Sequence, residues 1–124
     1  MIINCTAQPI LILNPSCCTF NPKTKGYTLN KELDVRIEFL TSGICPRCKT
    51  EEENLGTLDG VPLIRIRFGE IEGLPDRKEH TYFIVPAIVA NAGKEIGRTD
   101  LLVPSRVVRD NEGKVVGCLA LAKV

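Results

Sequence analysis

The chain has 124 residues, of which 44% are hydrophobic and 25% charged, as in one ordinary globular domain. Its formal net charge of +1 excludes a global basic field that could hold long nucleic acid by counterion release. No stretch approaches the ~20 apolar residues that a membrane-spanning helix needs, and the start of the sequence lacks the features of a signal peptide. We therefore expect a cytoplasmic protein that binds neither membranes nor long nucleic acid.

The first half of the sequence predicts short strands separated by loops. Residues Ile2–Asn14 are apolar and β-branched, and Pro9 removes a ladder donor, which favours two short strands with a break between them. Residues 14–26 are rich in Asn, Pro, Ser, Thr and Lys, a composition typical of a loop. Apolar and polar residues alternate in Leu33–Leu40, as in a half-buried strand. Residues 41–60 are predicted to form an excursion at the surface.

The second half opens with two further strands and the only predicted helix. Apolar and charged residues alternate in Val61–Phe68, and Thr81–Val85 is a continuous apolar run, so both segments indicate strands. Pro86 then begins a segment that ends at Gly93. Because Pro is favoured at the first helical position and Gly just beyond the last, this order predicts a helix over residues 86–92.

The end of the sequence predicts a hairpin. A short strand is expected at Leu101–Val103, and the β-branched runs Val107–Arg109 and Lys114–Val116 flank the turn-forming segment Asp110–Gly113. Short strands at regular spacing are typical of small barrels and sandwiches. The sequence therefore predicts a mainly β fold, a small compact barrel or sandwich with one short helix, formed by a single domain over residues 1–124.

Several stretches carry a resemblance to a known family: Asn4-Cys5-Thr6-Ala7-Gln8-Pro9, Gly56–Pro62, Phe68–Pro75, Gly97-Arg98-Thr99-Asp100 and Arg109–Cys118. In these stretches the chain resembles a family of small, uncharacterised proteins of bacteria and their phages, whose members open with Asn-Leu-Thr-Pro-His-Pro and continue with Gly-Thr-Leu-Asp-Gly-Val-Pro. Gln8 stands where the family pattern has His, so any role of that His is absent. Residues 16–54 do not match the pattern and look like an elaboration. The resemblance implies a phage-type protein but assigns no activity.

The cysteines form the most specific motif in the sequence, a candidate zinc site. In a cytosolic chain, six cysteines favour thiols or metal over disulfides. Cys45 and Cys48 form a Cys-x-x-Cys motif within the surface excursion, and two thiolates at this spacing can share one tetrahedral zinc ion. Cys17 and Cys18 are the candidates for the remaining ligands of a structural zinc site, with His80 as another. The alternative is ordinary surface thiols or a facultative disulfide, because a second Cys-x-x-Cys is missing.

Arginines on or next to predicted strands form a second candidate site, one that could bind an anion. Guanidinium groups bind phosphate or carboxylate through two parallel hydrogen bonds, so several of them on one sheet would make an anion site despite the neutral total charge. The predicted ligand-binding residues are Arg65, Arg67, Arg98, Asp100, Arg106 and Arg109.

The alternative for these arginines is structural pairing with acids. Arg98 could pair with Asp100 in the same loop, and Arg109 with Asp110 or Glu112. Arg65 and Arg67 could form a solvated strand face with acids such as Glu38 and Glu70.

Three functions from different classes follow from these observations. The first is a non-catalytic binding protein for a small anionic ligand, as in a phage-type protein that sequesters a nucleotide signal. The second is a protein-interaction module with a zinc-stabilised loop. The third is a small nucleotide hydrolase that uses His80 or a cysteine. We order them in this way because the sequence contains no convincing nucleophile–base pair. Small β proteins often complete a binding pocket at a subunit boundary, so we also expect a homo-oligomer.

Overall fold

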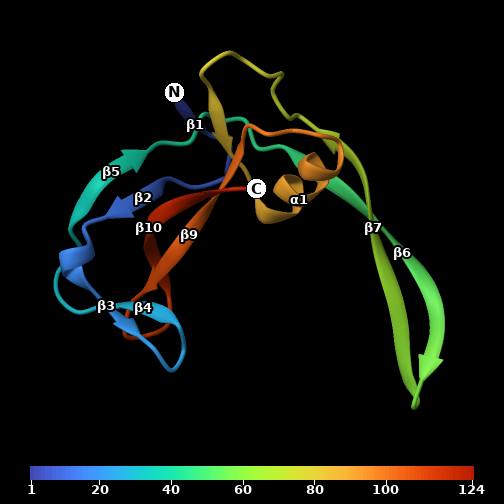
Figure 1. Ribbon diagram of the computed structural model, residues 1–124, viewed down its shortest axis with the longest axis horizontal. Coiled ribbons are helices and arrows are strands. Elements are labelled where there is room, and N and C mark those ends of the chain that lie inside the picture. The colour runs from blue at the N-terminus through green and yellow to red at the C-terminus, as the bar shows by residue number, and fades with distance from the viewer.

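The computed structural model describes residues 1–124, and they form an eight-stranded sheet that closes almost completely into a barrel, with a separate two-stranded hairpin beside it (Figure 1). Strands account for 53% of the chain and helix for 10%. The predicted mainly β, barrel-like fold with one short helix is confirmed.

The barrel, which we call the body, contains ten elements. They are β1 (Ile2–Asn4), β2 (Ile10–Leu13), a 3-10 turn (Pro15–Cys17), β3 (Cys18–Asn21), β4 (Gly26–Leu29), β5 (Val35–Phe39), β8 (Tyr82–Ile84), α1 (Ala87–Glu95), β9 (Leu101–Arg109) and β10 (Val115–Lys123). The sheet order is β1-β8-β9-β10-β2-β5, and β3 and β4 are attached through a pairing of β4 with β9. Residues 14–26, predicted as a loop, therefore contain β3 and begin β4.

Strand β9 organises the body because it has three neighbours. Its first residues pair with β8 in parallel, its last residues, Val108 and Arg109, pair with β4 in parallel, and β10 runs antiparallel along its whole length. The two strands predicted at 101–103 and 107–109 are thus one strand that continues through Pro104 and Arg106. The predicted turn at Asp110–Gly113 is confirmed, because the Asp110 carboxylate accepts bonds from the N–H groups of Glu112 and Lys114, both at 2.9 Å.

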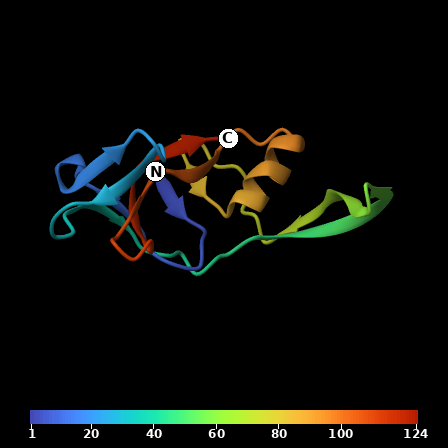
Figure 2. The same ribbon diagram turned by 90° about the horizontal axis from the view of Figure 1, so that it is seen from below.

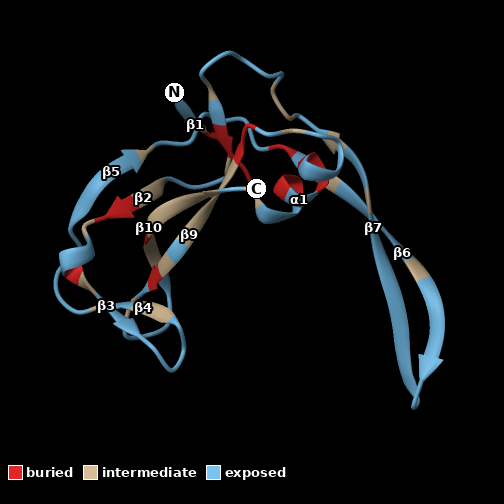
Figure 3. Ribbon diagram, viewed as in Figure 1, coloured by how far each residue is buried: buried red, intermediate tan, exposed pale blue.

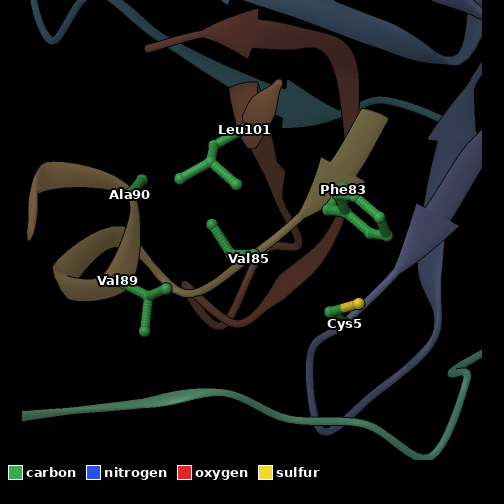
Figure 4. Close-up of a cluster of buried hydrophobic side chains, with 6 residues drawn as sticks. All are labelled: Cys5, Phe83, Val85, Val89, Ala90 and Leu101. Atoms are coloured by element: carbon green, nitrogen blue, oxygen red, sulfur yellow. The ribbon is translucent and has the colours of Figure 1, made fainter. Parts of the chain in front are cut away.

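The main core lies between the sheet and α1. Its buried side chains are Cys5, Phe83, Val85, Val89, Ala90 and Leu101 (Figure 4). The predicted helix is confirmed, but its predicted end at Gly93 is wrong. Gly93 is buried inside the helix, where a Cβ atom would collide with the Leu101 side chain. The glycine therefore permits a close approach of helix to sheet, and the left-handed glycine beyond the helix end is Gly97.

Asn4 closes the barrel where β1 approaches the end of β5. Its side-chain Nδ2 donates to the carbonyl oxygens of Gln8 (2.8 Å) and Phe39 (2.9 Å). Its Oδ1 accepts from the Thr6 N–H (3.0 Å) and the Thr6 hydroxyl (2.6 Å). Both donors and both lone pairs of the amide are therefore used by a side chain that is buried. Asn4 and Thr6 of the family-like opening have a structural role in this chain.

The separate hairpin, which we call the arm, consists of β6 (Arg47–Leu58) and β7 (Val61–Glu72). The surface excursion predicted over residues 41–60 is thus mostly one long strand. Its turn is the dipeptide Asp59-Gly60, and both residues have positive φ, as in the two-residue turns that join antiparallel strands. The arm extends away from the body and is exposed along nearly its whole length (Figures 1 and 3).

The strand predicted at residues 33–40 is present as β5, but the prediction that it is half-buried is wrong. Val35 and Ile37 are 40% and 45% exposed, and the charged residues between them are exposed as well. Strand β5 ends the sheet and pairs only with β2. No layer of the body covers its apolar side chains, which leaves them in contact with solvent.

Candidate ligand-binding cleft

The largest cleft lies between the β3–β4 hairpin and the end of β9. Its volume is about 740 Å³, and it is lined by Phe20, Pro22, Lys25, Gly26, Tyr27, Arg106, Val107 and Arg109. The parallel pairing of Tyr27 and Thr28 with Val108 and Arg109 holds the two walls together. The cleft therefore exists because residues that are far apart in the sequence are neighbours in the sheet.

Two aromatic rings form one wall of this cleft. Phe20 and Tyr27 are directly opposed on β3 and β4, with ring centroids 5.1 Å apart and ring planes tilted by 46°. Phe20 is 49% exposed, which is unusual for a side chain of this size and leaves a flat apolar surface open to a ligand. Exposed aromatic side chains of this kind are platforms on which a nucleobase stacks.

Three cations line the same cleft as the two rings. Lys25, Arg106 and Arg109 all line the cleft and are exposed, and none of them forms an ion pair. Arg109 Nη1 donates to the Gly113 carbonyl oxygen at 2.9 Å, which fixes the direction of its guanidinium group. No aspartate or glutamate lines the cleft, whereas each of the other three clefts contains at least one. The positive charge of this cleft is therefore uncompensated.

The backbone at two of these cations is strained. Lys25 has φ 55° in the β3–β4 turn, and Arg106 has φ 53° within β9. Non-glycine residues in the left-handed region cost of order 1–3 kcal/mol, and such residues cluster at ligand sites. Arg106 lines the cleft together with Val107 and Arg109 of the same strand. No pattern in the sequence could reveal this strain, because neither residue is of a type that favours the left-handed region.

The other predicted anion-binding residues lie elsewhere and have acid partners. On the arm, Glu53 accepts from Arg67 at 2.8 Å and lies 3.7 Å from Arg65, so the partner is neither Glu38 nor Glu70. The structure thus brings together only two of the five predicted arginines, Arg106 and Arg109.

Arg98 and Asp100 form a bidentate pair. Arg98 Nε and Nη2 donate to the two carboxylate oxygens of Asp100, each at 2.9 Å, and Nη2 also donates to the Pro75 carbonyl at 2.9 Å. Hydrogen bonds from Arg98 hold the pKa of Asp100 below its ordinary value, although burial acts in the opposite direction. Both side chains are largely buried, so the pair supports the loop after α1 and has few exposed polar atoms with which to bind a ligand.

The predicted zinc ligands are not gathered. No group of three or more His, Cys, Asp or Glu side chains is placed to hold a metal ion. Cys17 and Cys18 lead into β3, whereas Cys45 and Cys48 lie where β6 begins, and these places are on different sides of the body (Figures 1 and 2). Burial and the neighbouring Cys17 thiol raise the pKa of Cys18 to about 11, which disfavours the thiolate that zinc binds.

The six free thiols differ strongly in exposure. Cys45 is exposed and Cys48 and Cys18 are partly exposed, whereas Cys5, Cys17 and Cys118 are buried. Burial also raises the pKa of Cys5 and of Cys118, so these two thiols are both shielded and protonated at neutral pH.

We therefore expect alkylation of the folded protein by iodoacetamide to modify Cys45 first. Cys5 and Cys118 should react only after the addition of denaturant, because thiolates at the surface are the reactive species. Peptide mass mapping of a labelling time course measures the order. Modification of Cys118 as early as Cys45 in native buffer would contradict the burial of Cys118.

His80 is the remaining candidate for catalysis. It lies in an exposed loop with φ 55°, and its Nε2 is 3.3 Å from the Glu79 carboxylate. The cleft beside His80 is lined by acidic and basic side chains but by no cysteine. Neither of its threonines, Thr81 and Thr99, is hydrogen-bonded to His80. This arrangement does not provide an activated nucleophile.

Comparisons of the chain with protein-family models, with curated proteins and with solved structures return no match. The resemblance to the family of small bacterial and phage proteins therefore stays a prediction. None of the helices combines the length and the apolar composition that a crossing of the lipid bilayer requires.

Proposed function

We propose that the protein is a non-catalytic binding protein for a small anionic ligand that carries a flat ring, the chemistry of a nucleotide. The observation that supports this proposal is the cleft between β3, β4 and β9, which is lined by Lys25, Arg106 and Arg109 and by the Phe20–Tyr27 ring pair, with no carboxylate among the lining residues. The cations suit the phosphate groups, and the rings suit the base.

The energetics of such a site are sufficient for useful affinity. Hydrogen bonds to charged groups contribute about 1.5–3 kcal/mol each, and stacking on an aromatic ring contributes about 1–3 kcal/mol per base. Two cations and one stacked base support micromolar binding after the costs of association and ordering are met. The size of the cleft, about 740 Å³, lies within the range of small-molecule sites.

Sequestration fits this site better than hydrolysis does. None of the eight lining residues is a histidine, cysteine, serine, threonine, aspartate or glutamate. The Tyr27 phenol and the Lys25 amine could act as nucleophiles only with a general base beside them, and the cleft provides no carboxylate or imidazole for this role. A nucleotide signal bound there would be removed from solution intact. The proposed biological role is that of a phage-type protein that withholds such a signal from its receptor.

The test is isothermal titration calorimetry with a panel of linear and cyclic nucleotides, followed by heat denaturation and chromatography of the released ligand. We expect Arg106→Gly and Arg109→Ala each to weaken nucleotide binding by about 10- to 150-fold. Glycine at position 106 tolerates the positive φ, so this variant removes the charge without adding backbone strain. Arg36→Ala is the matched control, because this exposed arginine lies on β5, away from the cleft.

Phe20→Ala separates the ring contribution from that of the charges. It should weaken binding of the nucleotide while leaving the affinity for inorganic triphosphate unchanged. Recovery of altered nucleotide after denaturation would favour the hydrolase. The absence of uptake for every nucleotide in the panel, with the wild-type protein folded, would refute the proposal.

A further inference from the structure

The chain exposes more surface than a compact monomer of its mass. Its accessible surface is 8579 Å² at 13.7 kDa, whereas the scaling for folded monomers gives roughly 6,600 Å². The excess of roughly 2,000 Å² per chain is in the range of about 1,000–2,500 Å² that one partner buries in an obligate homodimer. The excess surface includes two apolar regions, one on the arm and one on β5.

Strand β7 of the arm carries a row of apolar side chains that nothing in the chain covers. The register of β6 and β7 places Ile64, Ile66 and Phe68 in a row on one face, beside their polar partners Asn54, Glu52 and Thr50 on β6, and Ile64 and Ile66 are 50% and 56% exposed. The opposite face holds the pairs that Glu53 makes with Arg65 and Arg67. A two-stranded hairpin is at best marginally stable in water by itself, so this arm needs a surface to lie on.

The base of the arm is anchored, and its outer part is free. Cys48 and Ile71 pack against the core cluster beneath α1. Beyond these residues the two strands extend out of the body, and both views show no other segment beside them (Figures 1 and 2). A strand of 12 residues spans about 40 Å, which is enough to cross a second molecule of this size.

Strand β5 offers the complementary surface on the body. It is the longest body strand that has one edge without a partner strand, with five residues against three in β1 and four in β3. Its Val35 and Ile37 side chains are exposed. The two views place β5 on the side of the body opposite the arm, so the arm of the same chain does not reach it (Figures 1 and 2).

We propose that two copies of this chain form a two-fold symmetric dimer in which the arm of each copy packs its Ile64–Phe68 face against β5 of the other. This arrangement covers both apolar regions at once, because an isologous contact uses the same pair of surfaces twice. It also explains why a long exposed hairpin and an uncovered sheet end occur in one chain. This inference does not depend on the proposed ligand.

The first test is sedimentation equilibrium of the full chain. The wild type should sediment with twice the 13.7 kDa chain mass. Ile66→Lys and Ile37→Lys should each weaken dimerisation by about 100-fold or more, because each places a charge in a buried apolar contact. In Ile66→Lys the introduced ammonium group would face Glu52 across the arm, so the hairpin keeps a favourable cross-strand pair. Ile88→Lys, at an exposed position of α1, is the control and should leave the mass at twice the chain mass.

Mixing the two variants makes the test specific for the arm and β5. The Ile66→Lys chain retains an intact β5, and the Ile37→Lys chain retains an intact arm, so the mixture restores one of the two contacts. With one chain labelled with ¹⁵N and the two chains mixed in equal amounts, native mass spectrometry should show the heterodimer as clearly more than half of all dimers, which is its share when chains pair at random. A heterodimer share of half or less would refute the pairing of the arm with β5.

A fluorescent probe guards against variants that simply unfold the arm. The chain has no tryptophan, so Ile66→Trp introduces a single reporter. Its emission should be that of a buried indole at high protein concentration and should shift to longer wavelength on dilution. Emission of a solvent-exposed indole at every concentration, or a wild-type chain that sediments as a monomer, would overturn the proposal.

Discussion

Replacement of Arg98 by leucine is expected to lower the free energy of unfolding by about 3–5 kcal/mol, because it leaves a buried carboxylate without its partner. In the wild type, Arg98 bonds to both oxygens of Asp100 and to the Pro75 carbonyl. The Asp100 residue is 6% exposed, and its backbone carbonyl accepts from Phe83, so the loop cannot easily carry the carboxylate into water. Urea denaturation followed by far-UV circular dichroism at one protein concentration measures the change.

The control for this prediction is another basic residue in a salt bridge of similar length. Lys49 lies 3.0 Å from Glu72 on the arm, and both side chains are mostly exposed. Lys49→Ala should leave the unfolding curve almost unchanged, because water screens exposed pairs. Equal effects of Arg98→Leu and Lys49→Ala would show that the Arg98–Asp100 pair has no special role in the fold.

The Arg98–Asp100 pair also makes the free energy of unfolding depend on pH. Because the pKa of Asp100 is lowered in the folded state, its contribution to stability is complete above the ordinary carboxyl pKa of about 3.9 and is lost as the pH falls through the folded value. In Arg98→Leu, burial without the guanidinium raises this pKa instead. The difference in stability between wild type and variant should therefore be largest at neutral pH, and it should begin to shrink above the ordinary value of about 3.9, as the pH falls through the raised pKa of Asp100 in the variant.

Most of the body could be predicted from local patterns. The segments around Pro9, the run 81–85 and the Asp110–Gly113 turn are correct because each depends on neighbouring residues. In the arm, the alternation of apolar and charged residues predicts only the second strand, because two bulges and the polar run before Asn54 obscure the alternation of β6. The dipeptide Asp59-Gly60 was the signal that could have revealed the hairpin.

Only some of the residues that line the candidate cleft could be predicted from the sequence. Arg106 and Arg109 were singled out by chemistry, but Phe20, Lys25 and Tyr27 lie in and next to a segment whose composition is that of a loop. Their place in the cleft depends on the parallel pairing of β4 with β9, a contact between segments that no short-range pattern connects. For the same reason the sequence could not separate Arg65, Arg67 and Arg98, which have acid partners, from the two arginines that do not.

Replacement of Asn4 by aspartate is expected to lower the free energy of unfolding by about 3 kcal/mol or more at neutral pH. The change is nearly isosteric, but it removes the two N–H donors that bind the carbonyls of Gln8 and Phe39. A carboxylate oxygen would then face two carbonyl oxygens at about hydrogen-bond distance inside the junction that closes the barrel. Asn91→Asp, at an exposed position of α1, is the control and should have little effect.

The pH dependence of Asn4→Asp should be opposite in sign to that of Asp100. Burial and the facing carbonyls raise the pKa of the new carboxyl group in the folded state, because both disfavour its charged form. The loss of stability is therefore greatest at neutral pH. It decreases as the pH falls through the raised pKa towards about 3.9, because protonation restores one hydrogen-bond donor. Urea denaturation at a series of pH values should show Asn4→Asp approaching the wild type on acidification. A difference that stays constant from about pH 7 to pH 4 would mean that the cost comes from packing and that the hydrogen bonds of Asn4 do not hold the barrel closed.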